Sequence, residues 1–305
     1  MINNTLNEQI SFSILMANYN NANYIEEAIR SVILQTYPLW ELIIVDDCSS
    51  DNSIDIIKPF LKDKRIKLIC NERNIGYGGS LRRAADNASN MIFGILDSDD
   101  KLHETALDVM AGAYKRNSQF GFIYSTCWGC DSELKNCVIN KDIGTFRNIK
   151  SVFFREKISH FKTFKKEAYQ KTSGFNVNQK KAVDKDIILK LEEVTNIKFI
   201  NKPLYYHRYH ENQISQGKYE FEAFVYYYRA KCKAYQRRLN TNFPNCTLKE
   251  LYFQYFYIIF HKLILVLKKC LKFFRIPVFF IKIHKLTPKI LIIRLEELKS
   301  LIKFL

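Results

Sequence analysis

The sequence has no long uncharged hydrophobic run. Its most apolar part, residues 251–305, is divided by lysines and arginines, so it never reaches the ~18 apolar residues that a membrane-spanning helix requires. Met1 to Gln9 is polar and contains Glu8, which does not resemble a secretory leader. We therefore expect no transmembrane helix, a cytoplasmic location, and eight cysteines that stay reduced.

A zinc site and a dinucleotide-binding loop also lack support. Cys127, Cys130 and Cys137 suggest zinc or redox chemistry, but a zinc site needs a fourth ligand at suitable spacing. The glycines within residues 76–79 do not form the dinucleotide fingerprint, because Leu81 stands where its third glycine belongs. The sequence therefore argues against an NAD-dependent enzyme, and zinc or redox chemistry stays a minor alternative.

Negative charge is scarce as well. Asp and Glu number 31 against 47 Lys and Arg, a net charge of +16. Residues 251–305 hold 11 Lys and Arg and 2 Asp and Glu, a net charge of +9. Basic segments rich in aromatic residues lie in the headgroup plane of membranes. We expect this part to contact a membrane surface; the alternative is a helical extension that packs on the rest of the chain or on a second subunit.

The first hundred residues alternate short apolar runs with helical stretches. The apolar runs are Phe12–Ala17, Leu42–Val45, Ile66–Cys70 and Ile92–Leu96. Alternation at this spacing predicts a parallel sheet with right-handed crossovers. Ligands of such sheets gather at the carboxyl ends of the strands.

Carboxylates follow two of these runs. Asp46 and Asp47 come after the second run, and Asp97, Asp99 and Asp100 come after the fourth. A fan of carboxylates holds a hard divalent cation, which in turn binds phosphate. Asp46 and Asp47 alone favour a loop start and helix cap. Taken together, the two acidic groups predict a nucleotide-diphosphate site. They would repel nucleic acid, for which the basic, aromatic composition is the only indication.

Several stretches resemble the family 2 glycosyltransferases of the GT-A fold. Four of them lie in the first hundred residues: 13–25, 31–38, 41–47 and 96–100. Residues 182–187 resemble the family's acidic catalytic motif, and residues 203–215 resemble the segment that closes the domain. The resemblance covers about residues 11–216.

The resemblance implies an α/β fold of the GT-A type, a mostly parallel Rossmann-like nucleotide-binding sheet flanked by helices. We place this catalytic domain at residues 8–218 and a basic amphipathic helical segment at residues 219–305. Residues 119–180 would supply the mixed part of the sheet and the region that faces the acceptor.

The resemblance also implies which residues bind the donor. The backbone at Ala17 and the ring of Tyr19 would hold the base of a nucleotide-sugar. Asp47 would accept hydrogen bonds from the base, and Asp97 would bind the ribose. An aromatic face and a carboxylate suit a base, because one stacks on it and the other accepts from its N–H groups.

For the chemical step, the resemblance implies a metal ion and a base. Asp99 would coordinate Mn²⁺ or Mg²⁺ on the diphosphate, and His210 matches a position that contacts the metal or diphosphate in some relatives. Packing or surface exposure is the alternative for His210. Asp184 would be the general base. Val183 replaces the family's usual glutamate beside it, and Asp186 is a competing candidate for the base.

The activity implied is inverting transfer of a hexosyl unit, most often from a UDP-linked donor, with a dTDP-linked donor as the alternative. Family members of this size commonly act on a glycan or lipid-linked oligosaccharide, at the inner face of the bacterial cytoplasmic membrane, in surface polysaccharide assembly. A non-catalytic nucleotide-sugar-binding protein, suggested by Val183, and a nucleic-acid-binding protein stay as alternative functions.

Overall fold

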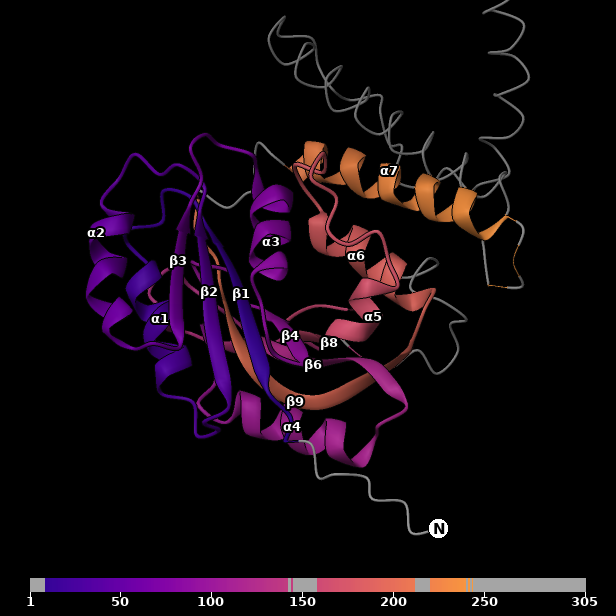
Figure 1. The fold of residues 1–305 in the computed structure, drawn as a ribbon, viewed down its shortest axis with the longest axis horizontal. Helices are drawn as coiled ribbons and strands as arrows, with labels where there is room; N and C mark the ends of the chain where they lie inside the picture. Colours follow the sequence, from indigo (N-terminus) through magenta and orange to yellow (C-terminus); the bar gives the residue numbers. More distant parts are fainter. Residues whose placement is uncertain are drawn as a thin grey trace, which may run out of the picture. The chain divides into compact units, whose positions relative to one another are not determined.

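Helices cover both faces of a central mixed sheet in the computed structural model (Figure 1). The structure describes residues 9–141, 144, 158–211, 220–239, 241 and 243. The predicted membrane-contacting part, residues 251–305, lies outside these described residues. The helical segment expected at 219–305 and the boundary near residue 218 therefore stay predictions.

The first half of the chain alternates strands and helices as expected. In order, its elements are β1 (Phe12–Asn18), α1 (Ile25–Ile33), β2 (Trp40–Asp46), α2 (Ser53–Ile57), the 3-10 helix η1 (Lys58–Lys62), β3 (Ile66–Cys70), α3 (Tyr77–Asp86) and β4 (Ile92–Ile95). The helix that the pattern predicts over residues 54–61 is divided between α2 and η1. Pro59 lies near the start of η1 and lacks the N–H group that a continuous α-helix needs there.

The second half completes the sheet and adds further helices. Its elements are β5 (Lys101–Leu102), α4 (Ala106–Arg116), β6 (Phe120–Cys130), β7 (Val138–Ile139), β8 (Lys162–Lys165), α5 (Lys166–Gln170), α6 (Val183–Glu192), β9 (Asn196–Arg208) and α7 (Glu220–Arg238). None of the described helices has the length and apolar character that crossing a membrane requires.

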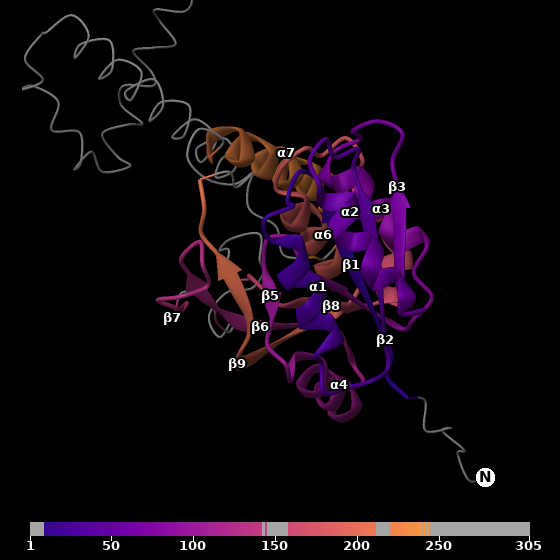
Figure 2. The same cartoon turned by 90° about the vertical axis from the view of Figure 1, so that its left-hand side faces the viewer.

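The strand order is β3-β2-β1-β4-β8-β6-β9-β5, with β7 paired to β6. The strands from β3 to β4 are parallel, whereas β8 is antiparallel to both β4 and β6. Figure 2 shows β5, β6 and β9 on the side of the sheet away from β2 and β3. The fold is therefore the expected mixed α/β sheet, and residues 119–180 supply β6, β7 and β8 of its mixed part, to which β5 and β9 add a further antiparallel pair.

Successive side chains of the central strands point to opposite faces of the sheet, so each face has its own hydrophobic core. On β1, Ile14 and Met16 pack with α1 and α4, whereas Leu15 and Ala17 pack with α3 and α6. Figure 1 shows α1 and α2 on one side of β1–β3 and α3 and α6 on the other. Both faces of β1 and β2 are buried, which explains why these strands are continuous apolar runs rather than alternating ones.

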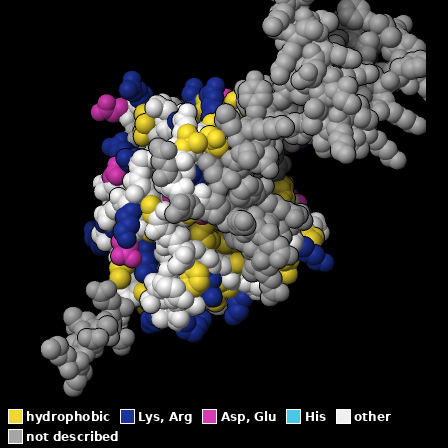
Figure 3. Space-filling model, turned by 90° about the vertical axis from the view of Figure 1, so that its right-hand side faces the viewer, with side chains coloured by type: hydrophobic (Ala, Val, Ile, Leu, Met, Phe, Trp, Pro, Cys, Tyr) yellow, Lys and Arg dark blue, Asp and Glu magenta, His cyan; other side chains and the backbone are white. Residues whose placement is uncertain are grey.

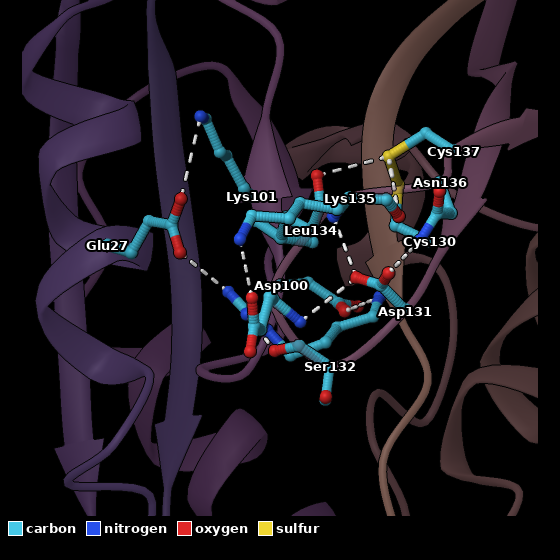
Figure 4. Close-up of a disulfide and its surroundings, with 12 residues drawn as sticks. Glu27, Asp100, Lys101, Cys130, Asp131, Ser132, Leu134, Lys135, Asn136 and Cys137 are labelled. Carbon is cyan, nitrogen blue, oxygen red and sulfur yellow. Dashed lines mark hydrogen bonds and ion pairs between the residues drawn. A yellow bond between two sulfur atoms is a disulfide. The ribbon is translucent and has the colours of Figure 1, made fainter.

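A disulfide joins Cys130, the last residue of β6, to Cys137, so the expectation of reduced thiols is wrong for this pair. The Asp131 carboxylate accepts hydrogen bonds from the backbone N–H groups of Glu133 and Lys135 at 3.1 and 2.7 Å and closes the turn between them (Figure 4). The pairing also removes two of the three thiols that a zinc site here would use. Sequence spacing did not reveal the pair, because only this turn brings the two sulfur atoms together.

Candidate active site

The carboxyl ends of β1, β2 and β4 meet at one edge of the sheet. Asn18 ends β1 and pairs in register with Asp46, which ends β2. Tyr19 and Asp47 follow directly, and Asp97 comes two residues after β4. Because β1 lies between β2 and β4, the winding of the chain reverses here, and open α/β sheets bind ligands at such a point.

The two carboxylates at the end of β2, Asp46 and Asp47, both hold loops. Asp47 is only 3% exposed and accepts hydrogen bonds from Asn71 Nδ2 at 2.7 Å and from the N–H groups of Ile75 and Gly76 at 2.8 Å. These bonds shape the loop that leads into α3. Asp46 is fully buried and accepts from the Ser49 N–H at 2.9 Å. Loop formation is thus one role of this pair, and contact of Asp47 with a base stays a prediction.

Tyr19 stands out at the tip of β1, because its side chain is 48% exposed while Ala17, two residues earlier, is almost buried. An exposed aromatic ring is a suitable surface for stacking a planar base. Asn21 Nδ2 donates to Ser98 Oγ at 2.7 Å and connects this loop to the turn after β4. The predicted base-binding and metal-binding loops are therefore physically joined.

Strand β9 holds the turn Asp97–Asp100 through two residues that sequence analysis missed. The Asp97 N–H donates to the Tyr205 hydroxyl at 3.1 Å, and this hydroxyl donates to Asp100 at 2.7 Å. The Arg208 N–H donates to the other oxygen of Asp100 at 2.8 Å, and its Nε donates to the Asp99 carbonyl at 2.6 Å. Asp100 is therefore the buried anchor of the turn.

Asp99 and His210 lie together, as the sequence predicts for a metal site. Asp99 Oδ2 and His210 Nε2 are 2.9 Å apart, and the ring of Tyr24 lies 4.7 Å from the His210 ring. A carboxylate oxygen and an imidazole nitrogen are ligands that suit Mn²⁺, and the carboxylate also suits Mg²⁺. At this separation both atoms reach one cation, so the pair fits the ion that the family resemblance implies.

A second group of possible ligands lies beside this pair. One ligand atom each from Asp100, His160 and His207 lies within 4.8 Å of the others. Burial lowers the pKa of His160 well below its usual range, and burial, partly opposed by Asp99, lowers the pKa of His207 to about 4. Both imidazoles are therefore neutral near pH 7. Asp100 already accepts a hydrogen bond on each oxygen, which leaves fewer lone pairs for a cation than Asp99 has.

Asp97 lies at the same edge of the sheet, among the side chains around Asp97 and Asp99 that we call the crevice, and its pKa is unusual for a carboxylate. Burial and the neighbouring Asp99 raise the pKa of Asp97 to about 6, although Lys162 opposes them. The hydroxyl of Tyr77, the first residue of α3, donates to Asp97 Oδ1. This bond ties the start of α3 to the turn after β4. Tyr77 is thus a further site residue that sequence analysis missed.

Asp184 lies in the first turn of α6 and forms an ion pair. Its Oδ2 lies 2.8 Å from Lys162 Nζ and 3.6 Å from Lys185 Nζ. Burial alone would raise the pKa of Asp184, but the two ammonium groups outweigh it and hold this pKa well below its usual range. The charge of Asp184 also raises the pKa of Asp97 and Tyr77. Asp184 therefore belongs to the same crevice as the predicted donor residues.

The acidic and apolar neighbours of Asp184 on α6 are both buried in the protein core. Val183, which stands in place of the family's usual glutamate, is buried in the core. Asp186 is also buried and lies 2.6 Å from Lys190, whose Nζ donates to the Gly174 carbonyl at 2.7 Å. Asp186 thus forms an ion pair apart from that of Asp184, and the choice of base between them stays a prediction.

Some of the site residues that sequence analysis missed have a recognisable sequence pattern, and others have none. Tyr205 and His207 alternate along β9, and this period of two would have placed them on one face. Lys162 gave no such signal, because the sequence Lys-Thr-Phe-Lys of β8 does not show that its first lysine is buried.

Comparison with known proteins identifies a family for this chain. Residues 13–179, more than half of the chain, match the model of glycosyl transferase family 2. The chondroitin synthases of Pasteurella multocida (strain Pm70) and Escherichia coli are 31% and 30% identical over 201 and 217 residues, which are 63% and 69% of this chain. These matches span only 20% and 30% of the two synthases. The Escherichia coli UDP-Glc:alpha-D-GlcNAc-diphosphoundecaprenol beta-1,3-glucosyltransferase WfgD is 38% identical over 112 residues, 37% of this chain and 44% of WfgD.

Solved structures show the same fold. S. aureus TarS 1-349 in complex with UDP-GlcNAc has a TM-score of 0.65 and 21% identity, over 77% of this chain and 68% of that one. The mannosyltransferase PcManGT of Pyrobaculum calidifontis, in complex with GDP-Man and Mn²⁺, has a TM-score of 0.55 and 15% identity, over 78% and 67%. The sequence motifs, the sheet and these likenesses agree, and the chain therefore belongs to glycosyl transferase family 2 and has the GT-A fold.

Proposed function

We propose that this protein is an inverting, metal-dependent glycosyltransferase. It moves a sugar from a UDP-linked donor to a hydroxyl of a glycan or lipid-linked oligosaccharide in the assembly of a bacterial surface polysaccharide. The observation that carries the proposal is the shared crevice, in which Asp184 lies close enough to Asp97 to raise its pKa and the Asp99–His210 pair adjoins Asp97. One side of the crevice suits a metal-bound diphosphate, and the other offers a base.

The donor would lie across the carboxyl ends of β1, β2 and β4. The Tyr19 ring and the backbone at Ala17 would hold the base, with Asp47 accepting from it and Asp97 binding the ribose. Support for UDP comes from the TarS structures with UDP and UDP-GlcNAc and from the donor named for WfgD. Asp99 and His210 would hold Mn²⁺ or Mg²⁺, which when bound neutralises charge on the leaving diphosphate.

Asp184 would take the proton of the acceptor hydroxyl. The acceptor oxygen then bonds to the anomeric carbon while the bond from that carbon to the diphosphate oxygen breaks on the opposite face. A single displacement of this kind inverts the anomeric centre. The pKa of Asp184 lies below its usual range, so the carboxylate is ionised near neutral pH and can accept a proton.

Tyr209 is our candidate for contact with the acceptor sugar. Its side chain is 42% exposed, and its ring lies 4.8 Å from that of His207. The ring also lies over Gly129, where an added Cβ would come within 2.7 Å of Tyr209 Cε2. The glycine therefore leaves room for the ring beside the crevice, where it can stack on the apolar face of a sugar.

Tyr209→Ala should raise the KM for the acceptor roughly tenfold, because it removes a stacking contact worth ~1.4 kcal/mol, and should leave the KM for the donor unchanged. Initial rates at varied acceptor and varied donor concentrations measure this split. Tyr19→Ala should give the opposite split, with only the donor KM raised. Equal effects of Tyr209→Ala on both KM values would contradict the assignment.

A nucleic-acid function is not supported by the distribution of charge. The crevice is lined by carboxylates of Asp97, Asp99, Asp100 and Asp184, which repel a polyanion. On the face shown in Figure 3, the lysine and arginine side chains of the described residues are scattered rather than gathered into one stripe. Membrane contact through residues 251–305 stays a proposal, since these residues lie outside the described part.

Calorimetric titration with UDP, with and without Mn²⁺, tests the donor site, and dTDP serves as the competing nucleotide. We expect UDP to bind at least tenfold more tightly with Mn²⁺, as a bridging cation contributes more than about 1.4 kcal/mol. Proton NMR of the product anomeric centre then tests inversion. Binding without release of UDP from any UDP-sugar and glycan acceptor would favour the non-catalytic alternative, and no binding by folded protein would refute the donor site.

A further inference from the structure

Lys162 is a buried cation inside the crevice. Its side chain is 2% exposed, although lysine is almost never fully buried without a partner. The residue starts β8, which lies between β4 and β6, and it pairs in register with Ile95 on one side and Tyr124 on the other. The backbone of Lys162 is thus held from both sides, and its side chain is buried.

The ammonium group of Lys162 is directed at the proposed base. Its Nζ donates to Asp184 Oδ2 at 2.8 Å. The other oxygen, Oδ1, accepts from the backbone N–H of Lys185 at 2.9 Å. Both carboxylate oxygens are therefore fixed by donors from two different elements, β8 and α6, so one orientation of the Asp184 carboxylate is selected.

The other charged and titratable groups around Asp184 come from every side of the crevice. They are Lys185 of α6, His160 before β8, Tyr77 of α3, Asp97 and Asp99 after β4, and His207 of β9. The carboxylates among them disfavour a negative charge on Asp184, and the two imidazoles are neutral near pH 7. Lys162 makes the closest contact of a cation with Asp184, because Lys185 Nζ lies farther away at 3.6 Å.

We propose that Lys162 is a positioning residue for the transfer step. Its ammonium group holds the Asp184 carboxylate ionised and in one orientation before the acceptor binds. This inference rests on the proposed function, in which Asp184 is the base. A purely structural ion pair would contribute to stability alone, whereas a positioning residue also determines the pH range in which the base works.

The test compares the pH dependence of kcat in the wild type, Lys162→Met and Lys162→Arg. Methionine fills the space without charge, so Asp184 loses its nearest cation while Asp97 and burial remain, and its pKa rises. We expect ~100-fold loss of kcat near neutral pH in Lys162→Met, growing about tenfold for each pH unit below the new pKa. Lys162→Arg should recover most of the rate and the wild-type pH profile.

Lys165→Met is the matched control, because Lys165 ends the same strand but donates to the Ser118 carbonyl at 2.9 Å, not to a crevice residue. Its pH profile should equal that of the wild type. Thermal unfolding and UDP binding with Mn²⁺ establish that each variant is folded. If Lys162→Met does not fold, Lys162→Gln takes its place. A Lys162→Met profile that runs parallel to the wild-type profile would overturn the proposal.

A second readout does not depend on turnover and so separates this inference from the proposed function. The ¹³C resonance of the Asp184 carboxyl, assigned by its loss in Asp184→Asn, is followed against pH. We expect it to titrate at a higher pH in Lys162→Met than in the wild type. An unchanged titration refutes the role of Lys162 even in an active enzyme, whereas a shifted titration in an inactive protein refutes only the proposed function.

Discussion

Asp184→Asn is expected to lower kcat by ~10²- to 10⁴-fold while UDP affinity stays within about threefold of the wild type. Asparagine keeps the shape of the side chain but cannot accept the proton of the acceptor hydroxyl. The substitution also leaves the buried Lys162 without its carboxylate, so we expect the free energy of unfolding to fall by roughly 3 kcal/mol. Initial rates at saturating substrates and calorimetric UDP titration measure the two effects separately.

Asp186→Asn is the matched control on the same helix. Asp186 pairs with Lys190, so its loss should lower the melting temperature and leave kcat unchanged at temperatures where the variant is folded. Loss of turnover in Asp186→Asn with normal turnover in Asp184→Asn would assign the base to Asp186. The double variant Asp184→Asn with Lys162→Met should be more stable than Asp184→Asn alone, because it removes the unpaired buried charge.

Asp99→Ala is expected to abolish the Mn²⁺-dependent part of UDP binding and to lower kcat/KM by ~100-fold or more, since a bound cation contributes several kcal/mol at the leaving diphosphate. Alanine removes the carboxylate oxygen that lies 2.9 Å from His210 Nε2 and leaves the imidazole as the only ligand of the pair. Calorimetric titration of UDP, with Mn²⁺ present and absent, measures the change directly.

The control for this variant is Asp55→Ala, which removes an exposed carboxylate paired with Lys58 on the surface. UDP binding and its dependence on Mn²⁺ should be unchanged there. Metal dependence that survives Asp99→Ala but disappears in His207→Ala would locate the ion at the neighbouring group of Asp100, His160 and His207.

The parallel strands and the family were accessible from the sequence, because each central strand is buried on both faces and is therefore a continuous apolar run. The acidic residues that follow these runs were found for the same reason. The pairing of Cys130 with Cys137 was not found, since it depends on a turn closed by the Asp131 carboxylate. The division of the predicted helix over residues 54–61 depends on Pro59, whose effect the apolar pattern alone did not show.

The contacts inside the crevice join residues that are far apart in the chain. The hydroxyl of Tyr205 bonds to Asp100, 105 residues earlier, and Lys162 bonds to Asp184 from a different element of the fold. Local hydrophobic patterns describe which face of an element is buried, and they carry no information on which distant polar groups will meet. Lys162 is an example, because a lysine next to threonine in a short strand has the local pattern of a surface residue. Its burial follows only from the position of β8 between β4 and β6.

The sequence by itself determined the family, the parallel arrangement of the first strands and the carboxylates at their ends, since these depend on local periodicity and on short motifs. The tertiary structure alone decided the partners of those carboxylates. It buried Asp47 and Asp100 as anchors of loops, placed Asp99 against His210, and set Lys162 against Asp184. The physical reason is that the ionisation of a carboxylate depends on its burial and on the charges within a few ångströms, and only the folded sheet brings those charges together.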